Sequence, residues 1–215
     1  MGPVSHFLAG TAAILLAAGP VRGFADEHKH HHEHAGHKEH MHHHGGKAPQ
    51  EGYKRSVSSY EVPDVTLRGP DGAGITLREA LGGGNPVMLN FIFTTCPTIC
   101  PLLTASVSKL RQDLGADRDK IRMVSITIDP EYDTPAVMKE YANRFSADSG
   151  WMFLTGSAAD IVSIQHAFDA YRGNKMKHAP YTYLRASHEI SWTRLDGILS
   201  AEELEREARS ILTAR

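Results

Sequence analysis

Two nearly uninterrupted apolar runs define the centre of the expected sheet. They are residues 87–93 (VMLNFIF) and residues 121–128 (IRMVSITI). A strand that is apolar on both sides fits the middle of a sheet that is covered on both faces. The cluster Gly69-Pro70-Asp71-Gly72 separates two shorter runs and predicts the turn of a hairpin. The shorter expected strands are residues 65–67, 75–77, 151–154 and 188–195.

Apolar residues spaced three and four positions apart predict helices between these strands. After the first apolar run, Leu103, Val107 and Leu110 form such a series. Ser200, with Glu203 three residues later, predicts a capping box at the start of the last helix. The further expected helices are residues 135–145, capped by Asp133 or Thr134, residues 158–171 and residues 200–212.

The order of these elements predicts one α/β domain over residues 53–215. Strands that alternate with helices imply parallel pairing in a central β-sheet flanked by helices. The segment has the usual size of a single domain. The formal net charge is −2, and acidic and basic residues are interspersed. No cationic surface is therefore expected, which argues against nucleic acid as a partner.

Residues 1–25 are typical of a signal peptide. The apolar run at residues 6–19 is too short to cross a hydrocarbon core of ~30 Å, which takes about 20 residues. Gly23 and Ala25, followed by Asp26, suit cleavage after Ala25. We therefore expect an exported protein, periplasmic if the source is bacterial. In the alternative, the segment stays uncleaved and tethers the protein to a membrane.

Residues 26–52 hold a histidine-rich tract with almost no large apolar side chain. Such a tract cannot bury enough surface to offset its ordering entropy, so we expect it to be disordered without a ligand. Imidazole binds copper, zinc and nickel, and the tract therefore predicts a metal-collecting tail for additional copper or zinc. A solubilising linker or a purification tag is the alternative, although Glu, Ala, Gly, Lys and Met interrupt the tract. The histidines are His28, His30, His31, His32, His34, His37, His40, His42, His43 and His44.

The chain has two cysteines, Cys96 and Cys100, directly after the first apolar run. The sequence Cys-Pro-Thr-Ile-Cys-Pro opens the first long helix, so both sulfurs are expected near a helix N-terminus at the carboxyl end of the sheet. The helix dipole and the free N–H groups there favour the thiolate. Two thiolates select Cu(I), or zinc in a closed tetrahedral site. The alternative is a redox dithiol, whose usual signature has two intervening residues, not three.

A site with two thiolates calls for a further donor, and three histidines of the predicted domain are candidates. His166 falls on the apolar face of an expected helix, which is typical of a packed core histidine. His178 lies in a polar loop beside Met176, where it is either solvated or a mobile donor. His188 begins an expected strand and would be held by the sheet.

Two long motifs resemble those of the Sco/SenC family of copper chaperones. They are residues 91–101 (FIFTTCPTICP) and residues 124–135 (VSITIDPEYDTP), and Leu154-Thr155-Gly156 and a histidine near the last strand follow in the same order. The resemblance covers about residues 62–212.

This resemblance implies a thioredoxin-like domain that binds one copper ion through Cys96, Cys100 and His188. It also implies a role in assembling the dinuclear copper centre of cytochrome c oxidase, so the expected partner is a subunit of that enzyme or a similar cuproprotein. The family usually has Asp-His-Ser around the ligand, whereas this chain has Ser187-His188-Glu189.

Copper carriage by a metallochaperone is therefore the leading hypothesis. Asp129, after the second apolar run, could orient the cysteine loop from outside the ligand shell. The alternative function is a thiol-disulfide reductase that acts on the cysteines of a copper acceptor. A peroxidase fits the fold less well, because no lone cysteine with a separate resolving partner is evident.

Overall fold

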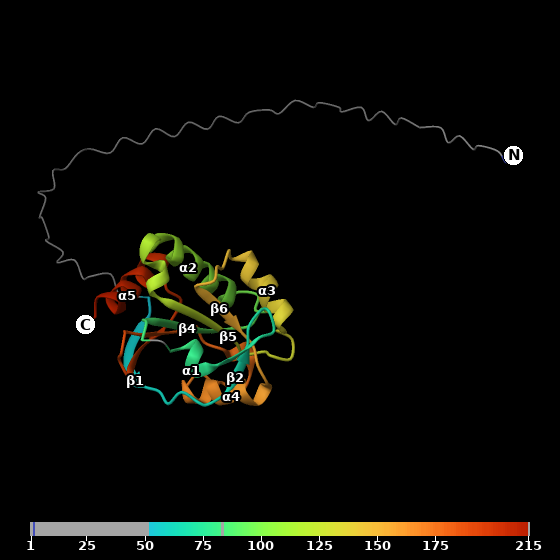
Figure 1. Cartoon of the computed structure of the whole chain (residues 1–215), viewed down its shortest axis with the longest axis horizontal. Helices are drawn as coiled ribbons and strands as arrows, with labels where there is room; N and C mark the ends of the chain where they lie inside the picture. The colour runs from blue at the N-terminus through green and yellow to red at the C-terminus, as the bar shows by residue number, and fades with distance from the viewer. Residues whose placement is uncertain (1, 3–51, 83, 215) are drawn as a thin grey trace, which may run out of the picture. The chain divides into compact units, whose positions relative to one another are not determined.

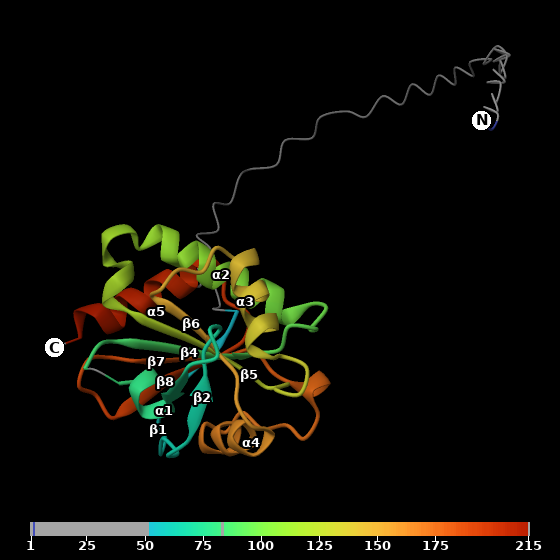
Figure 2. The same cartoon turned by 45° about the vertical axis from the view of Figure 1, so that its right-hand side comes forward.

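A six-stranded mixed β-sheet lies between two layers of helices (Figures 1 and 2). The structure is a computed structural model that describes residue 2, residues 52–82 and residues 84–214. The predicted signal peptide, apart from residue 2, and the ten histidines of the tract lie outside these residues. The strands are β1 (Lys54–Ser59), β2 (Thr66–Arg68), β3 (Gly74–Thr76), β4 (Val87–Ile92), β5 (Arg122–Thr127), β6 (Trp151–Leu154), β7 (Tyr181–Arg185) and β8 (Ser191–Asp196). The α-helices are α1 (Leu77–Ala80), α2 (Ile99–Asp113), α3 (Pro135–Arg144), α4 (Ala158–Ala167) and α5 (Ala201–Thr213), with 3-10 turns at Gly115–Lys120 and Lys175–Lys177.

The main sheet has the strand order β1-β8-β7-β4-β5-β6. Strands β4, β5 and β6 are parallel, as predicted, because a helix crosses over between each pair. The pairs β1–β8, β8–β7 and β7–β4 are antiparallel, so the prediction of parallel pairing was wrong for this half of the sheet. A connection as short as the one between β7 and β8 can join only antiparallel neighbours.

Alternate residues of β4 point into two separate apolar cores. Met88 and Ile92 belong to the core under α2, α3 and α5, whereas Leu89 and Phe91 belong to the core under α1 and α4. Figure 2 shows these two groups of helices on opposite sides of the sheet. The central strand is thus buried on both faces, as its composition predicted.

The predicted hairpin and helix caps are confirmed. Strands β2 and β3 form a two-stranded antiparallel sheet around the Gly69–Gly72 turn. Ser200 and Glu203 form the expected capping box of α5, and Thr134, not Asp133, caps α3. Each of these caps satisfies N–H groups that a helix start leaves unpaired.

Several predicted boundaries were wrong at the C-terminal half of the domain. The last strand begins at Ser191, so His188 lies in the turn between β7 and β8 rather than at a strand start. Helix α4 ends at Ala167, and Asp169 just beyond it adopts a left-handed backbone with φ 48°. Strands β1 and β7 were not predicted.

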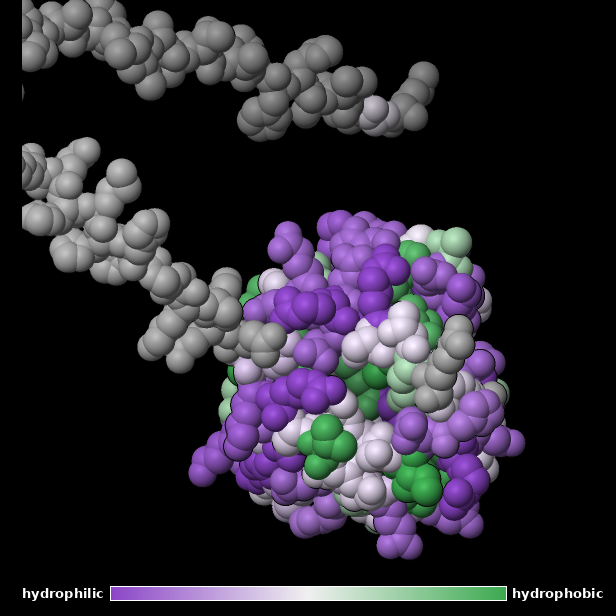
Figure 3. Space-filling model, turned by 90° about the vertical axis from the view of Figure 1, so that its left-hand side faces the viewer, coloured by the Kyte–Doolittle hydropathy of each residue, from purple (hydrophilic) through white to green (hydrophobic). Residues whose placement is uncertain are grey.

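On the face of the domain drawn in Figure 3, polar residues predominate and hydrophobic residues form small separate areas among them. No helix within the described ranges has the length and apolar character needed to cross a membrane.

Candidate metal centre

The two cysteines lie where β4 passes into α2, at the carboxyl end of the parallel strands. Cys96 precedes the helix, and Cys100 is its second residue. The Thr98 side chain makes no capping hydrogen bond at the start of this helix. Instead, the Cys100 N–H donates to Cys96 Sγ at 3.4 Å. The sulfur of Cys96 therefore takes the place of a capping oxygen.

The Cys96 thiol is partly exposed, and its pKa lies below the ordinary value of a thiol. Its burial opposes ionisation, but hydrogen bonds from the backbone of Cys100, Thr98 and Ile99 outweigh this and lower its pKa. These N–H groups point at the sulfur because they are the unpaired donors of the helix start. Of the two thiols, Cys96 is therefore the one that ionises more readily.

The Cys100 thiol has the opposite character. It is 1% exposed, and this burial raises its pKa to about 12, with further contributions from the nearby Cys96 and Asp133. Both cysteines are free thiols in the structure. One reactive thiol and one buried thiol one turn apart are suited either to metal binding or to disulfide exchange.

Asp133 holds the segment that leads to the cysteines, a role that its prediction as a helix cap did not include. Its carboxylate is fully buried and accepts hydrogen bonds from the N–H of Thr94 at 3.1 Å and from the Thr94 hydroxyl. It also accepts one from the Thr127 hydroxyl at 2.5 Å. A short Asp-Thr-Pro motif gives no sign of the contacts with Thr94, because that residue lies 39 positions away.

Asp129 does not contact the cysteine loop directly. Its carboxylate forms an ion pair with Lys175 at 2.5 Å, and this pairing raises the pKa of the lysine. The Lys175 Nζ also lies 5.8 Å from the centre of the Phe93 ring, three residues before Cys96. The loop that carries Met176 and His178 is therefore fastened beside the cysteine segment.

His178 lies at the same edge of the sheet as the cysteines. It precedes β7, whose first residues pair with the end of β4, and its Nε2 lies 3.0 Å from the Phe91 carbonyl oxygen. The side chain is 8% exposed, so the expectation of a solvated loop histidine was wrong. Burial lowers its pKa, and its Nδ1 has no hydrogen-bond partner in the structure. Met176, in contrast, is exposed.

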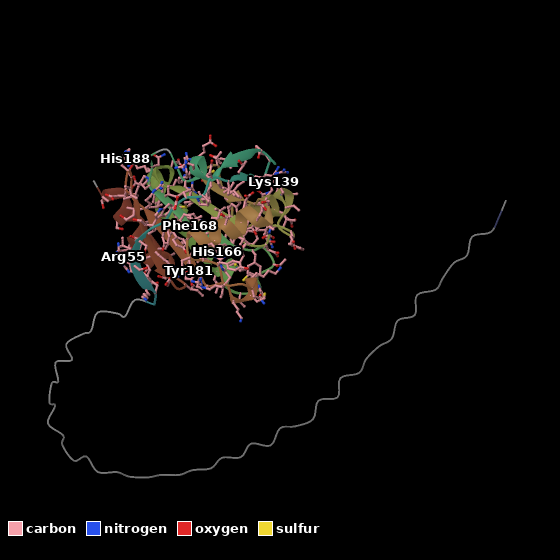
Figure 4. All side chains as sticks on the ribbon, turned by 90° about the horizontal axis from the view of Figure 1, so that it is seen from below. Arg55, Lys139, His166, Phe168, Tyr181 and His188 are labelled. Carbon is pink, nitrogen blue, oxygen red and sulfur yellow. The ribbon has the colours of Figure 1, made fainter. Side chains whose placement is uncertain are left out.

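His188 lies at the opposite edge. Strand β7 runs antiparallel to β4 with Arg185 beside Val87, so the residues after β7 lie where β4 begins. The His188 ring is packed against Gly84: a Cβ on that glycine would be 3.0 Å from its Cε1. Figure 4 shows His188, which follows β7, well apart from Tyr181, the first residue of that strand. The structure does not bring His188 to the cysteines.

His166, the third candidate, also lies in a different environment from the one predicted. It is exposed on α4 and stacks on Tyr171 at a centroid distance of 4.3 Å, so it is not the packed core histidine that the sequence suggested. Within the described part of the chain, no three histidine, cysteine or acidic side chains converge closely enough to hold a metal ion. The site in this conformation is a dithiol with a buried histidine on the neighbouring loop.

A dithiol at the start of the helix that follows the central parallel strand defines a thioredoxin-like protein. The SCO1/SenC family model matches residues 68–213, and the chain belongs to this family. The Bacillus subtilis SCO1 protein homolog is 38% identical over 99 residues, which cover 46% of this chain and 50% of that protein. The Rickettsia felis SCO2-like protein is 32% identical over 111 residues, or 47% and 53% of the two chains. These matches span about half the length of the curated relatives.

Solved structures share the fold over most of the domain. BsSco, described with a disulfide switch and as a member of the Sco family of cytochrome c oxidase assembly proteins, superposes with a TM-score of 0.62 and 27% identity. The alignment covers 74% of this chain and 98% of BsSco. Copper-bound ScoI of Bradyrhizobium japonicum gives a TM-score of 0.58 at 26% identity, covering 69% of this chain and 98% of ScoI.

Proposed function

We propose that this protein carries copper on Cys96 and Cys100 and delivers it to a partner protein. The observation that carries the proposal is the thiol pair at the start of α2, in which one sulfur already accepts helix N–H groups. Thiolates are soft donors that favour Cu(I) over harder cations. Membership of a family that includes copper-bound ScoI supports the same metal.

His178, rather than His188, is the third donor in this proposal. It lies at the edge of the sheet that carries the thiols, and its Nδ1 is free while Nε2 contacts the Phe91 carbonyl. A buried imidazole with a low pKa stays neutral, which is the form that binds a metal. Coordination requires a local shift of the loop around Lys175–Lys177, because the three side chains do not converge in this conformation.

Copper binding displaces the proton of the buried thiol. Cys96 ionises more readily and takes up the ion first, and Cys100 then gives its proton to solvent as its sulfur becomes a ligand. Delivery proceeds by ligand exchange, in which thiolates of the acceptor replace those of the carrier one at a time. The acceptor in this proposal is a cytochrome c oxidase subunit or a similar cuproprotein.

The histidine tract and the export signal complete the proposal. Strand β1 begins beside Asp196, and β8 ends at the edge of the sheet that carries the cysteines. We assign the collection of additional copper or zinc to the histidine tract of residues 26–52. The protein is exported, into the periplasm if bacterial, and it stays at a membrane only if its signal is uncleaved.

Loading of the whole protein with Cu(II) tests the proposal, because this ion, unlike Cu(I), makes coordination by thiolates visible. The thiolate-to-Cu(II) charge-transfer band reports copper at the cysteines and not at histidines alone. We expect Cys96→Ser and Cys100→Ser to abolish the band and His178→Ala to shift or remove it. His188→Ala, a histidine at the other edge of the sheet, is the matched control and should leave the band unchanged. A band that survives both cysteine substitutions would contradict the proposal.

The second candidate function is a thiol-disulfide reductase that acts on the cysteines of a copper acceptor. The difference in pKa between Cys96 and Cys100 favours it, as does the disulfide switch described for BsSco. Such a reductase needs both thiols but no histidine ligand. Reduction of a dithiol protein substrate by the His178→Ala variant at the wild-type rate, with its copper band lost, would separate the two functions.

A further inference from the structure

Tyr141 places a buried hydroxyl in the apolar core that contains Cys100. It lies on α3 and is 1% exposed. Its ring packs against Phe145 and Phe153, with centroid distances of 5.0 and 6.1 Å. Both of these partner rings are phenylalanines, which pack without a hydroxyl group. The hydroxyl group of Tyr141 therefore needs an explanation other than packing. A buried hydroxyl costs stability unless it is hydrogen-bonded.

The hydroxyl belongs to a chain of hydrogen bonds that ends at Cys100. Thr104, one turn further along α2, donates its hydroxyl hydrogen to the Cys100 carbonyl oxygen at 2.7 Å. A threonine hydroxyl has only one hydrogen, so the 3.1 Å contact between Thr104 Oγ1 and the Tyr141 hydroxyl is donated by Tyr141. Thr104 is also 1% exposed, and water cannot take the place of either group.

The phenol also lies within electrostatic range of both cysteines. Burial raises the pKa of Tyr141 to about 12; the hydrogen bond with Thr104 opposes this rise, and charge on Cys100 and Cys96 adds to it. The ring and the Cys100 sulfur therefore belong to one buried apolar core, where hydrogen bonds are electrostatically stronger than in water.

We propose that the Tyr141 and Thr104 hydroxyls form a positioning pair that holds Cys100 in place for copper binding. Tyr141 acts through Thr104, which fixes the first turn of α2 at the residue that carries the buried sulfur. This inference rests on the copper-carrier function proposed above. Groups that orient metal ligands from outside typically change metal affinity by about 10- to 100-fold when they are removed.

Competition for copper in the whole protein tests the pair. The copper-loaded protein is titrated with EDTA while the thiolate-to-Cu(II) band is followed. The histidine tract competes for copper equally in every variant. The ratio of copper retention between two variants therefore does not depend on the tract. Tyr141→Phe and Thr104→Val should each weaken retention of copper about 10-fold. The double variant should lose no more than either single one, because the residues act in series. Thr104→Ser keeps the hydroxyl and should restore wild-type retention.

Tyr183→Phe is the matched control. Tyr183 is fully buried, and its hydroxyl donates to the Phe168 carbonyl at 2.8 Å in the core on the other face of the sheet. If Tyr141→Phe retains copper as well as Tyr183→Phe does, the positioning role is refuted. If Tyr141→Phe does not fold, copper retention in Thr104→Val and Thr104→Ser is compared instead. Equal retention in these two variants would refute the positioning role. Failure of the wild-type protein to bind either Cu(II) or Cu(I) at its cysteines would instead refute the carrier function, and this inference with it.

Discussion

Asp133 accepts two hydrogen bonds from Thr94, one from its N–H and one from its hydroxyl. The start of α3 is thereby joined to the segment that leads from β4 to Cys96. A buried carboxylate with three donors around it is a stabilising element only while all three bonds are made.

Asp133→Asn should therefore destabilise the domain by about 1–3 kcal/mol, because an amide nitrogen cannot accept the bonds that the carboxylate accepts. It should also lower the pKa of Cys100, since the charge of Asp133 contributes to its elevation. Denaturant unfolding measures the first effect, and the pH dependence of Cys100 alkylation measures the second. Asp119→Asn, at an exposed carboxylate, is the control for stability. Equal unfolding free energies for the two variants would refute the structural role of Asp133.

Cys96 should react with iodoacetamide before Cys100. The rate for Cys96 should rise with pH through a pKa below the ordinary value of a thiol, because helix N–H groups favour its thiolate. Cys100 should react at least about tenfold more slowly, because its thiol is buried and rarely ionised. Mass spectrometry of the Cys96→Ser and Cys100→Ser variants gives each rate separately. Faster labelling of Cys100 at neutral pH would contradict the assigned roles.

His188→Gly should stabilise the domain by about 1 kcal/mol. The residue adopts φ 60°, a left-handed backbone that glycine enters without the penalty of a Cβ atom. Thermal or denaturant unfolding measures the gain. His166→Gly is a contrasting control at an exposed histidine inside α4, where glycine should cost about 1 kcal/mol. A loss of stability in His188→Gly would show that the imidazole contact with Gly84 outweighs the backbone strain.

Acid should weaken the folded state through His178. Burial lowers the pKa of this histidine in the folded protein, while the unfolded chain keeps a value of about 6.5. Between these two pKa values the unfolded chain binds more protons than the folded protein. The free energy of unfolding therefore falls as the pH decreases below about 6.5. Well above that pH, His178 has no effect on the free energy of unfolding. His178→Gln should reduce this dependence. His166→Gln should retain it, and identical pH profiles for both variants would contradict the prediction.

The sequence predicted the elements whose pattern is local. The apolar run of β4, the cysteines after it and the capping box at Ser200 all depend on neighbouring residues, and each is where it was expected. Strand β1 (KRSVSS) carries one apolar residue, so its pairing with β8 has no hydrophobic pattern to reveal it. Strand β8 itself was predicted, but with its start at His188 instead of Ser191.

The errors at the site have a related cause. His178 follows a polar segment, Gly173-Asn174-Lys175-Met176-Lys177, which is typical of a solvated loop. Its burial depends on Phe91 and on the pairing of β7 with β4, both distant in sequence. Because β7 was not predicted, the edge of the sheet at which each histidine lies could not be assigned, and His188 was chosen from the family resemblance. The structure has His178, not His188, at the edge that carries the cysteines.

The ring of Tyr181 lies near two guanidinium groups, those of Arg194 at 3.9 Å and Arg172 at 5.1 Å from its centre. Arg172 also donates to the Tyr181 hydroxyl. Residues 173–180 thus form a loop whose two ends are already joined. In the proposed copper carrier, most of the entropy of closing this loop is therefore lost when the domain folds, not when copper arrives.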